Sequence, residues 1–325
     1  MQEKSTVISI DIPSTDHTDF TLNFSQTAPH CVWLDWGDGS QRDSFSEEGL
    51  IEAHHVYADP GEYDISMFAV DDGKIELIGI NSDVGYRNMV TKLVVGDDVT
   101  LVHDNAFSGC ENLEELEFLG EDTVIGLFAF SGCVSLESAI LPTNLGTIPE
   151  GIFFGCTSLK EASIPINVSI IGANAFYGCC KLRDAGVYHA SEIGDYAFHG
   201  CRKLTILEFG KSIKKIGEGS FDSCTNIRTL ILGSATEIGD RAFCNCRSMA
   251  KLTIPATVTS IGDQAFYNCL FVQEVKMEAN RPPVLVSSSV FPHDDDYKIF
   301  VPYGKKRDYA YATNWGVYLD KIQEG

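Results

Sequence analysis

Apolar residues recur along this chain at intervals of 22 or 23 residues. The clearest part of the repeat is a phenylalanine followed three residues later by a cysteine, which occurs eight times: Phe107/Cys110, Phe130/Cys133, Phe153/Cys156, Phe176/Cys179, Phe198/Cys201, Phe221/Cys224, Phe243/Cys246 and Phe266/Cys269. An apolar residue follows each cysteine at +3, and most copies add two more at +6 and +8. Alternation at +6 and +8 is typical of a strand with one buried face, so the repeat predicts one short strand per coil of a solenoid.

The segments between these strands carry turn signals. Proline or glycine follows the strand in most copies and ends it, since proline lacks an N–H donor and glycine loosens the backbone. An Ile-Gly pair such as Ile238-Gly239 stands five and four residues before the phenylalanine in six copies. We expect this glycine to adopt a positive φ in a tight turn. The Ala-Phe-x-x-Cys segment after it is predicted to form a short helical or 3₁₀ turn.

The shared string Ile-Gly-x-x-Ala-Phe-x-x-Cys-x-x-Leu resembles the BspA-type leucine-rich repeat family of bacterial and some protist surface proteins. The resemblance covers about residues 88–280, and departures such as Val102-His103 in place of Ile-Gly are local. It implies a right-handed leucine-rich-repeat solenoid, and a role in adhesion at a bacterial cell surface. Such a stack needs caps over its open ends.

Residues 1–82 lack the repeat and are predicted to form a small antiparallel β-sandwich, with strands at 7–12, 20–24, 30–37 and 63–70. The pieces WLDWGDGS (33–40) and HVYADPGEY (55–63) resemble the polycystic-kidney-disease (PKD) type of immunoglobulin-like domain. In that resemblance Trp33, Trp36, Tyr57 and Tyr63 pack in the core and the turns, and Asp38 caps its own turn.

The repeats and a C-terminal cap are expected to fill residues 83–325. The cap, residues 281–325, keeps Phe291 but has Asp294 where a cysteine is expected. A last strand is predicted at 299–302, followed by a helix over 305–322 around Trp315. The cluster from His293 to Asp296 favours a solvated acidic turn over a metal site. The predicted fold class is therefore mostly β, a sandwich followed by a capped solenoid.

The charge balance restricts the partners. With 24 Lys and Arg against 46 Asp and Glu, the formal charge is −22, which disfavours nucleic acid and anionic membranes. No apolar run is long enough to span a bilayer, and the N-terminus lacks a signal-peptide pattern. The expected location is the cell surface or the secreted fraction, if a leader has been removed, and the alternative is the cytoplasm.

Candidate chemistry is sparse, and no cofactor or enzymatic activity is predicted. Eight of the eleven cysteines occupy one slot of the repeat, where inert buried thiols are favoured over nucleophiles; Cys31, Cys180 and Cys244 lie outside it. His54 and His55 are expected to be satisfied turn histidines. The carboxylates of Asp35, Asp38 and Asp43 alternate along the chain, so a calcium site is an alternative interpretation of this turn, although the EF-hand spacing is absent.

What remains is the exposed side of the strands, at +5 and +7 from each cysteine. The candidate partner-binding residues are Glu115, Glu117, Ile140, Glu161, Asp184, Ile206, Glu208, Thr229, Ile231, Lys251 and Lys276. This face predicts a recognition or adhesion protein for a protein or glycan ligand, host extracellular matrix being one option. The alternatives are a structural spacer of a surface assembly and an accessory glycan-binding module of a larger enzyme system. A second stripe, Phe154, Tyr177, His199 and Tyr267, is explained at least as well by packing between coils.

Overall fold

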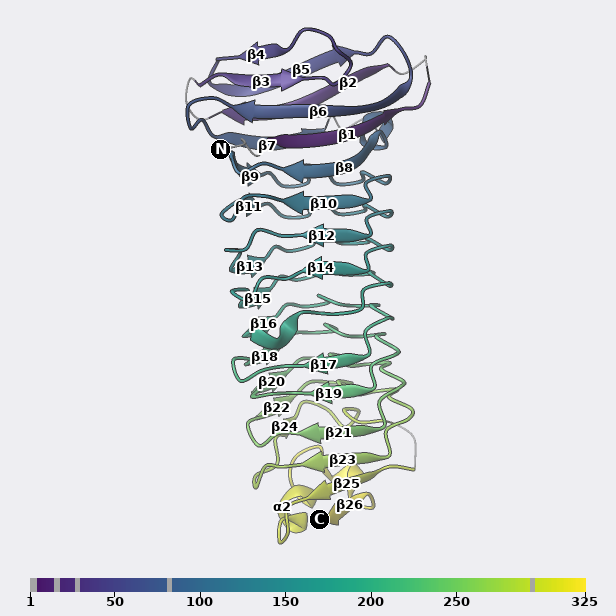
Figure 1. Ribbon diagram of the computed structural model, residues 1–325. Coiled ribbons are helices and arrows are strands. Elements are labelled where there is room, and N and C mark those ends of the chain that lie inside the picture. Colours follow the sequence, from purple (N-terminus) through teal and green to yellow (C-terminus); the bar gives the residue numbers. More distant parts are fainter. Residues whose placement is uncertain (1–4, 15–17, 27–29, 81–83, 293–295) are drawn as a thin grey trace. The chain divides into compact units, whose positions relative to one another are not determined.

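The computed structural model describes residues 5–14, 18–26, 30–80, 84–292 and 296–325, and the chain divides into two compact units, residues 1–167 and 168–325 (Figure 1). Strands hold 33% of the residues and helices 5%, which confirms the predicted mostly-β solenoid class. The cluster proposed as an acidic turn, His293 to Asp296, falls largely outside the described residues.

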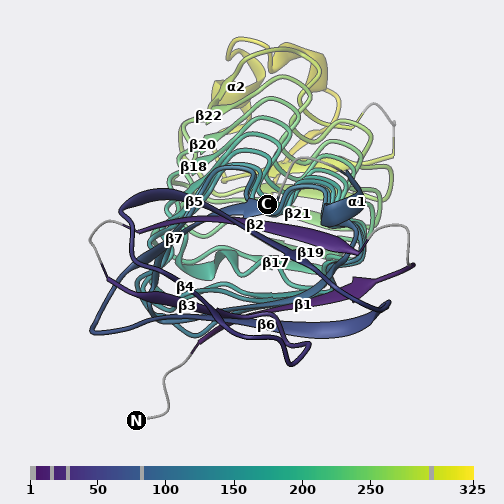
Figure 2. The same cartoon turned by 90° about the horizontal axis from the view of Figure 1, so that it is seen from above.

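Unit 1 combines a β-sandwich with the first coils of the solenoid. Its elements are β1 (Thr6–Ile12), β2 (Asp19–Gln26), β3 (Val32–Asp35), β4 (Asp43–Phe45), β5 (Gly49–Val56), β6 (Gly61–Ala69), β7 (Ile75–Ile80), α1 (Val84–Arg87), β8 (Val90–Val95), β9 (Val99–Val102), β10 (Glu115–Phe118), β11 (Val124–Ile125), β12 (Ser138–Ile140), β13 (Thr147–Ile148) and β14 (Glu161–Ser163). Strands β1 to β7 pair antiparallel in two layers, β1-β6-β3-β4 and β7-β2-β5 (Figure 2). This confirms the predicted sandwich, although only four of its seven strands were predicted.

Both sheets of the sandwich continue into the coils. Strand β8 pairs antiparallel with β1 and parallel with β10, and the first sheet runs on through β12 and β14. In the second sheet β9 pairs parallel with β7 and with β11. The sandwich therefore covers the first coil with paired backbone, as a solenoid cap must. A domain boundary at residue 82 stays a prediction.

Unit 2 holds the later coils and the C-terminal cap. Its elements are β15 (Ile170–Ile171), η1 (Val187–His189), β16 (Glu192–Ile193), β17 (Ile206–Glu208), β18 (Lys215–Ile216), β19 (Thr229–Ile231), β20 (Glu237–Ile238), β21 (Lys251–Ile254), β22 (Ser260–Ile261), β23 (Glu274–Met277), β24 (Val284–Leu285), β25 (Lys298–Val301), α2 (Lys306–Ala310), η2 (Gly316–Tyr318) and β26 (Ile322–Glu324). One parallel sheet contains β15-β16-β18-β20-β22-β24, and the repeat strands form β17-β19 and β21-β23-β25-β26. Residues at the same repeat position pair with each other, as Leu207 does with Leu230.

One predicted strand is missing. The repeat predicts a strand at residues 184–186, but the Asp184 carboxylate accepts a hydrogen bond from the Gly186 N–H at 2.9 Å, and Gly186 has a φ of 58°. A residue in the left-handed region cannot continue a strand, and η1 follows directly. Ala185 and Val187 still bury their side chains, so this coil keeps its core and loses its strand.

The Ala-Phe-x-x-Cys segments are consecutive β-turns closed by i to i+3 hydrogen bonds, the bonds of the predicted 3₁₀ turn, but they form no helix. Around Phe221, the N–H of Asp222 donates to Gly219 O at 3.0 Å and the N–H of Cys224 donates to Phe221 O at 3.2 Å. Left-handed residues interrupt any helix, and one stands just before every ladder cysteine: Gly109, Gly132, Gly155, Gly178, Gly200, Ser223, Asn245 and Asn268. Glycine, asparagine and serine fill this slot because bulkier side chains tolerate that backbone poorly.

The glycine of the Ile-Gly pair does not have the positive φ that we expected from the sequence. It is required because a larger residue would clash with the preceding coil. Among the described coils, Gly126, Gly194, Gly217, Gly239 and Gly262 all lie outside the left-handed region. A Cβ on Gly262 would instead stand 2.3 Å from the backbone nitrogen of Asp240 in the preceding coil. The glycine therefore sets how closely neighbouring coils approach.

Phenylalanines and cysteines form the core of the stack. Phe198, Phe221, Phe243 and Phe266 are fully buried, with near-parallel rings whose successive centroids are 5.1, 5.5 and 5.4 Å apart. In unit 1 the same stacking joins Phe107 to Phe130 at 5.7 Å. Stacked aromatic pairs add to the stability that burial alone provides.

The C-terminal segment covers the end of the stack, but its form differs from the predicted one. Phe291 extends the ring stack at 6.1 Å from Phe266, and Trp315 is fully buried. The predicted helix over 305–322 is wrong, because α2 has only five residues and η2 three. Asn314 has a φ of 65°, which stops a helix there. The chain then forms β26, which pairs with β25 and covers the edge of the predicted last strand.

Candidate interaction surfaces

The predicted binding residues of unit 1 lie on the outer side of the first sheet. Glu115 and Glu161 are exposed, Glu117 is half-buried, and the side chain of Ile140 is 49% exposed. The residues between them, such as Leu116, are buried, which confirms the orientation inferred from the alternation. Figure 1 shows these strands, β10, β12 and β14, lying one beside the next.

The predicted residues of unit 2 also face solvent. Ile206 and Ile231 are 60% and 46% exposed and lie diagonally on the paired strands β17 and β19, beside Glu208 and Thr229. Lys251 and Lys276 are exposed and are paired with Glu274 at 2.9 Å and Glu278 at 3.4 Å. Asp184 is exposed too, but it stands in the coil without a strand and caps its own turn.

A groove in unit 1 was not predicted. It has a volume of about 380 Å³ and lies where the sandwich meets the first coils, lined by Glu62, Tyr63, Asp64, Lys92, Glu114 and Glu115 among others. Its floor follows one row of the sheet, because Asp64 faces Ser9, Ser9 faces Lys92, and Lys92 faces Glu115. The ammonium group of Lys92 bonds to Glu115 at 2.7 Å, which raises the pKa of that lysine. The groove is thus lined by four carboxylates and one lysine.

The net charge of the chain is concentrated in unit 1. Residues 1–167 contain 6 Lys and Arg against 29 Asp and Glu, a formal charge of −23. Residues 168–325 contain 18 Lys and Arg against 17 Asp and Glu, a charge of +1. The two units therefore present different electrostatic surfaces, which the charge of the whole chain conceals.

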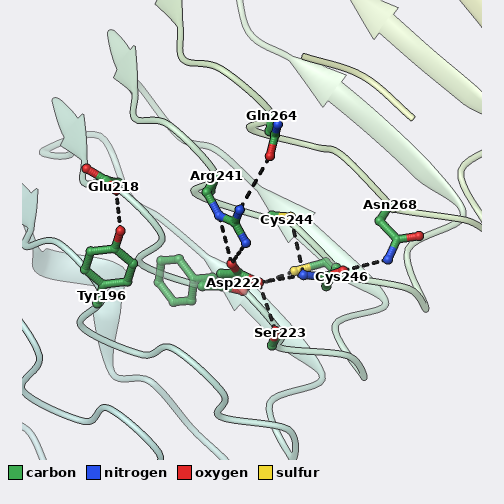
Figure 3. A network of polar contacts seen from close by, with 11 residues as sticks. Tyr196, Glu218, Asp222, Ser223, Arg241, Cys244, Cys246, Gln264 and Asn268 are labelled. Atoms are coloured by element: carbon green, nitrogen blue, oxygen red, sulfur yellow. Dashed lines mark hydrogen bonds and ion pairs between the residues drawn. The ribbon is translucent and has the colours of Figure 1, made fainter. Parts of the chain in front are cut away.

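A polar network links the turns of unit 2 (Figure 3). The carboxylate of Asp222 is almost fully buried and accepts hydrogen bonds from Arg241 Nη2 at 2.9 Å, Asn245 Nδ2 at 2.8 Å and Ser223 Oγ at 2.9 Å. Asn268 Nδ2 then donates to Asn245 Oδ1 at 2.6 Å. Every oxygen of the carboxylate is occupied, so this network ties neighbouring coils together.

The stripe that follows the phenylalanines also packs between coils. The rings of Tyr177 and His199 stack with centroids 4.6 Å apart. Phe154 lies 6.4 Å from Phe128 in a tilted arrangement. These contacts support the packing interpretation of the stripe.

The acidic turn of the sandwich is held by internal partners. Arg42 Nε donates to Asp35 at 2.9 Å, and Trp36 Nε1 donates to Asp43 at 2.7 Å. Burial raises the pKa of Asp38, but hydrogen bonds from Ser40 and His55 outweigh it and lower that pKa to about 2. The N–H of Ser40 donates to Asp38 Oδ1 at 2.9 Å, which confirms the predicted turn cap. The described residues contain no group of three His, Cys, Asp or Glu side chains arranged to hold a metal ion.

The aromatic and histidine side chains around this turn are structural. Trp36 and Tyr57 are buried as predicted, whereas Trp33 and Tyr63 are only half-buried. His55 stacks on Trp36 at 4.8 Å and bonds to Asp38 at 2.8 Å. Its neighbour His54 lies 3.1 Å from Thr21 Oγ1, so both histidines have partners as expected, but they lie in strand β5 and not in a turn.

The ladder cysteines are sealed in the core. All eight are fully buried, and six have their Sγ within 3.1–3.3 Å of the carbonyl oxygen of the phenylalanine in the preceding coil. Burial raises the pKa of Cys269 to about 12, and it raises the pKa of Cys244, a buried cysteine outside the ladder, to about 11. A thiol that does not ionise near neutral pH is a poor nucleophile and a poor metal ligand.

Thiol labelling of the native protein should therefore be slow at most sites. We expect a reagent for free thiols to label Cys31 and Cys180 rapidly, because these two are partly exposed, and the nine buried cysteines only as the protein opens. Counting the labelled thiols against time, with the denatured protein as the control for all eleven, checks this. Rapid native labelling of most of them would contradict the burial of the ladder.

The described residues contain no helix long and apolar enough to cross a membrane. Their coils, ring stack and parallel strands are those of a leucine-rich repeat protein. The BspA type leucine rich repeat region matches residues 79–190 and 187–282 in six copies, so the chain belongs to that family.

The chain is similar to several solved structures at low sequence identity. A leucine-rich repeat protein from Bacteroides ovatus is 20% identical with a TM-score of 0.53, over 72% of this chain and 66% of that one. The Treponema pallidum leucine-rich repeat protein is 22% identical with a TM-score of 0.44, over 61% and 83%. A leucine-rich cell surface protein from Faecalibacterium prausnitzii is 19% identical with a TM-score of 0.38, over 76% and 87%. No curated protein matches the chain.

Proposed function

We propose that the protein is a non-enzymatic recognition or adhesion protein that binds a protein or glycan partner through the exposed faces of its repeat strands. The observation that carries the proposal is the exposure of Ile140, Ile206 and Ile231. Beta-branched side chains in the middle of a regular strand face gain nothing from solvent, whereas a partner surface would bury them.

The groove of unit 1 supports a basic partner for that half of the molecule. Glu62, Asp64, Glu114 and Glu115 line it beside Lys92, and the unit around it carries a charge of −23. Field lines from such a surface attract cationic groups and speed their association. A lysine- or arginine-rich segment of a protein fits this chemistry.

Membership of the BspA-type family and the PKD-like motifs of the sandwich support a place at a bacterial cell surface. Buried thiols are compatible with export, because oxidants reach only Cys31 and Cys180 readily. A binding experiment distinguishes an array that recognises a partner from one that serves only as a structural spacer.

The test is a binding screen of the whole protein against extracellular-matrix proteins and glycans, with one variant for each unit. The first combines Glu115→Lys, Glu117→Lys and Ile140→Ser, and the second combines Ile206→Ser, Glu208→Lys and Ile231→Ser. A control replaces Val124 and Val284, exposed apolar residues of the other sheets, with serine. We expect a partner whose binding at least one face variant abolishes and the control retains. No partner at all, or equal loss in the control, would favour the spacer.

A further inference from the structure

The turns that lead into β17, β19 and β21 carry a row of cations. Arg202 and Arg247 stand at +1 from their cysteines, Lys203 at +2 and Arg228 at +4, and all four side chains are exposed. These turns lie at the tails of the strand arrows in Figure 1. We name these four residues the basic edge. In unit 1 the charged residues at the same repeat positions are Glu111, Glu114, Glu137 and Lys160, so the edge is mainly acidic there and basic in unit 2.

The basic edge is not neutralised by its own unit. In the part of the chain that the structure describes, none of its four cations has a carboxylate within 4.0 Å, whereas Lys215, Arg241 and Lys251 of the same unit are all paired. An exposed, unpaired and repeated arginine is suited to an external anion, because guanidinium binds sulfate, phosphate and carboxylate through two parallel hydrogen bonds.

The backbone of the basic edge is held rigidly. Asn226 Nδ2 donates to Arg202 O at 2.8 Å, and Ser248 Oγ donates to Thr225 O at 2.8 Å, so each turn is tied to the one before it. The cations are thus presented at the regular spacing of the coils. Neighbouring strands lie about 4.8 Å apart, so the backbones of Arg202 and Arg247, which are two coils apart, are separated by roughly 10 Å.

We propose that the basic edge binds a linear sulfated polysaccharide. Such a polymer repeats its anionic groups once per two sugar rings, a length similar to two coils. The positions between the cations hold Thr225, Asn226 and Ser248, which are polar and offer no apolar pocket for the side chains of an acidic peptide. They also offer no aromatic ring on which the bases of a single-stranded nucleic acid could stack. This surface is separate from the strand faces and does not depend on their function.

Heparin, as an oligosaccharide of defined length, is the probe, measured by calorimetry with the full chain at low ionic strength. The test variant combines Arg202→Ala, Arg228→Ala and Arg247→Ala. The matched control combines Lys211→Ala, Lys214→Ala and Lys298→Ala, which removes the same charge from exposed positions of the same unit. We expect binding to weaken about tenfold or more in the test variant and little in the control, since exposed charge contacts are weak singly and act together. Added salt should weaken the wild-type complex, because it screens these charges.

Three further probes separate the sources of anionic charge. Chemically desulfated heparin should bind much more weakly than heparin, and polyglutamate and single-stranded DNA should bind weakly and without dependence on the basic edge. Equal loss in the control variant, no heparin binding at low salt, or equally tight and edge-dependent binding of polyglutamate or DNA would each overturn the proposal. Unchanged circular dichroism of both variants shows that they are folded.

Discussion

Replacing Phe221 with alanine is expected to lower the free energy of unfolding by about 3–5 kcal/mol. The ring is fully buried, its neighbours Phe198 and Phe243 stack on it at 5.1 and 5.5 Å, and Phe209 meets its edge at 5.8 Å. Alanine would leave a cavity within the stack, and the coils on either side could not close it, since their glycine contacts already fix the spacing. The two neighbouring rings, Phe198 and Phe243, both lose their stacking contact in this variant.

Urea denaturation followed by circular dichroism measures this loss, with Phe271→Ala as the control. Phe271 is a phenylalanine of the same unit, but its side chain is 66% exposed, so its removal should change stability by less than about 0.5 kcal/mol. Similar losses in the two variants would mean that the ring stack contributes little beyond ordinary surface packing.

The sequence predicts those parts of the fold that one repeat can specify by itself. Alternation at +6 and +8 identifies which side of each strand is buried, and the structure agrees for Leu116, Leu207 and Leu230. The repeat also predicts a strand at residues 184–186, but Asp184 and Gly186 form a turn there instead. Local side-chain chemistry therefore decides the backbone where the strand is only three residues long.

Features that depend on two distant segments were not predicted. The acidic groove requires β1 to pair with β8, about 80 residues later, and no local pattern encodes that pairing. Strand β5 was missed because only Ile51 and Ala53 are buried in it, and the exposed Leu50 and Val56 obscure the alternation. The basic edge, in contrast, was accessible from sequence, since the charged residues at +1, +2 and +4 are mainly acidic in the first half, with Lys160 as the exception, and basic in the second.

Replacing Gly262 with alanine is expected to destabilise the protein by about 1–3 kcal/mol, although its backbone conformation suits any residue. The new Cβ would lie 2.3 Å from Asp240 N and 2.5 Å from Gly239 C, atoms of the preceding coil's backbone that no side-chain rotation can move aside. The two coils must separate, which weakens the parallel pairing of β20 and β22 and the contact between Phe243 and Phe266.

The control for this prediction is Gly146→Ala, a glycine that also lacks a positive φ but has no atom within 4 Å of the added Cβ. That variant should be neutral or stabilised by up to about 1 kcal/mol, because alanine restricts the unfolded chain. The denaturation midpoints of the two variants distinguish two reasons for the glycine of the Ile-Gly pair: the close approach of the neighbouring coil, and the conformational freedom of the glycine backbone. If Gly262→Ala were as stable as Gly146→Ala, close contact would not explain the glycine, and the spacing of the coils would have to be set by the ring and cysteine ladders alone.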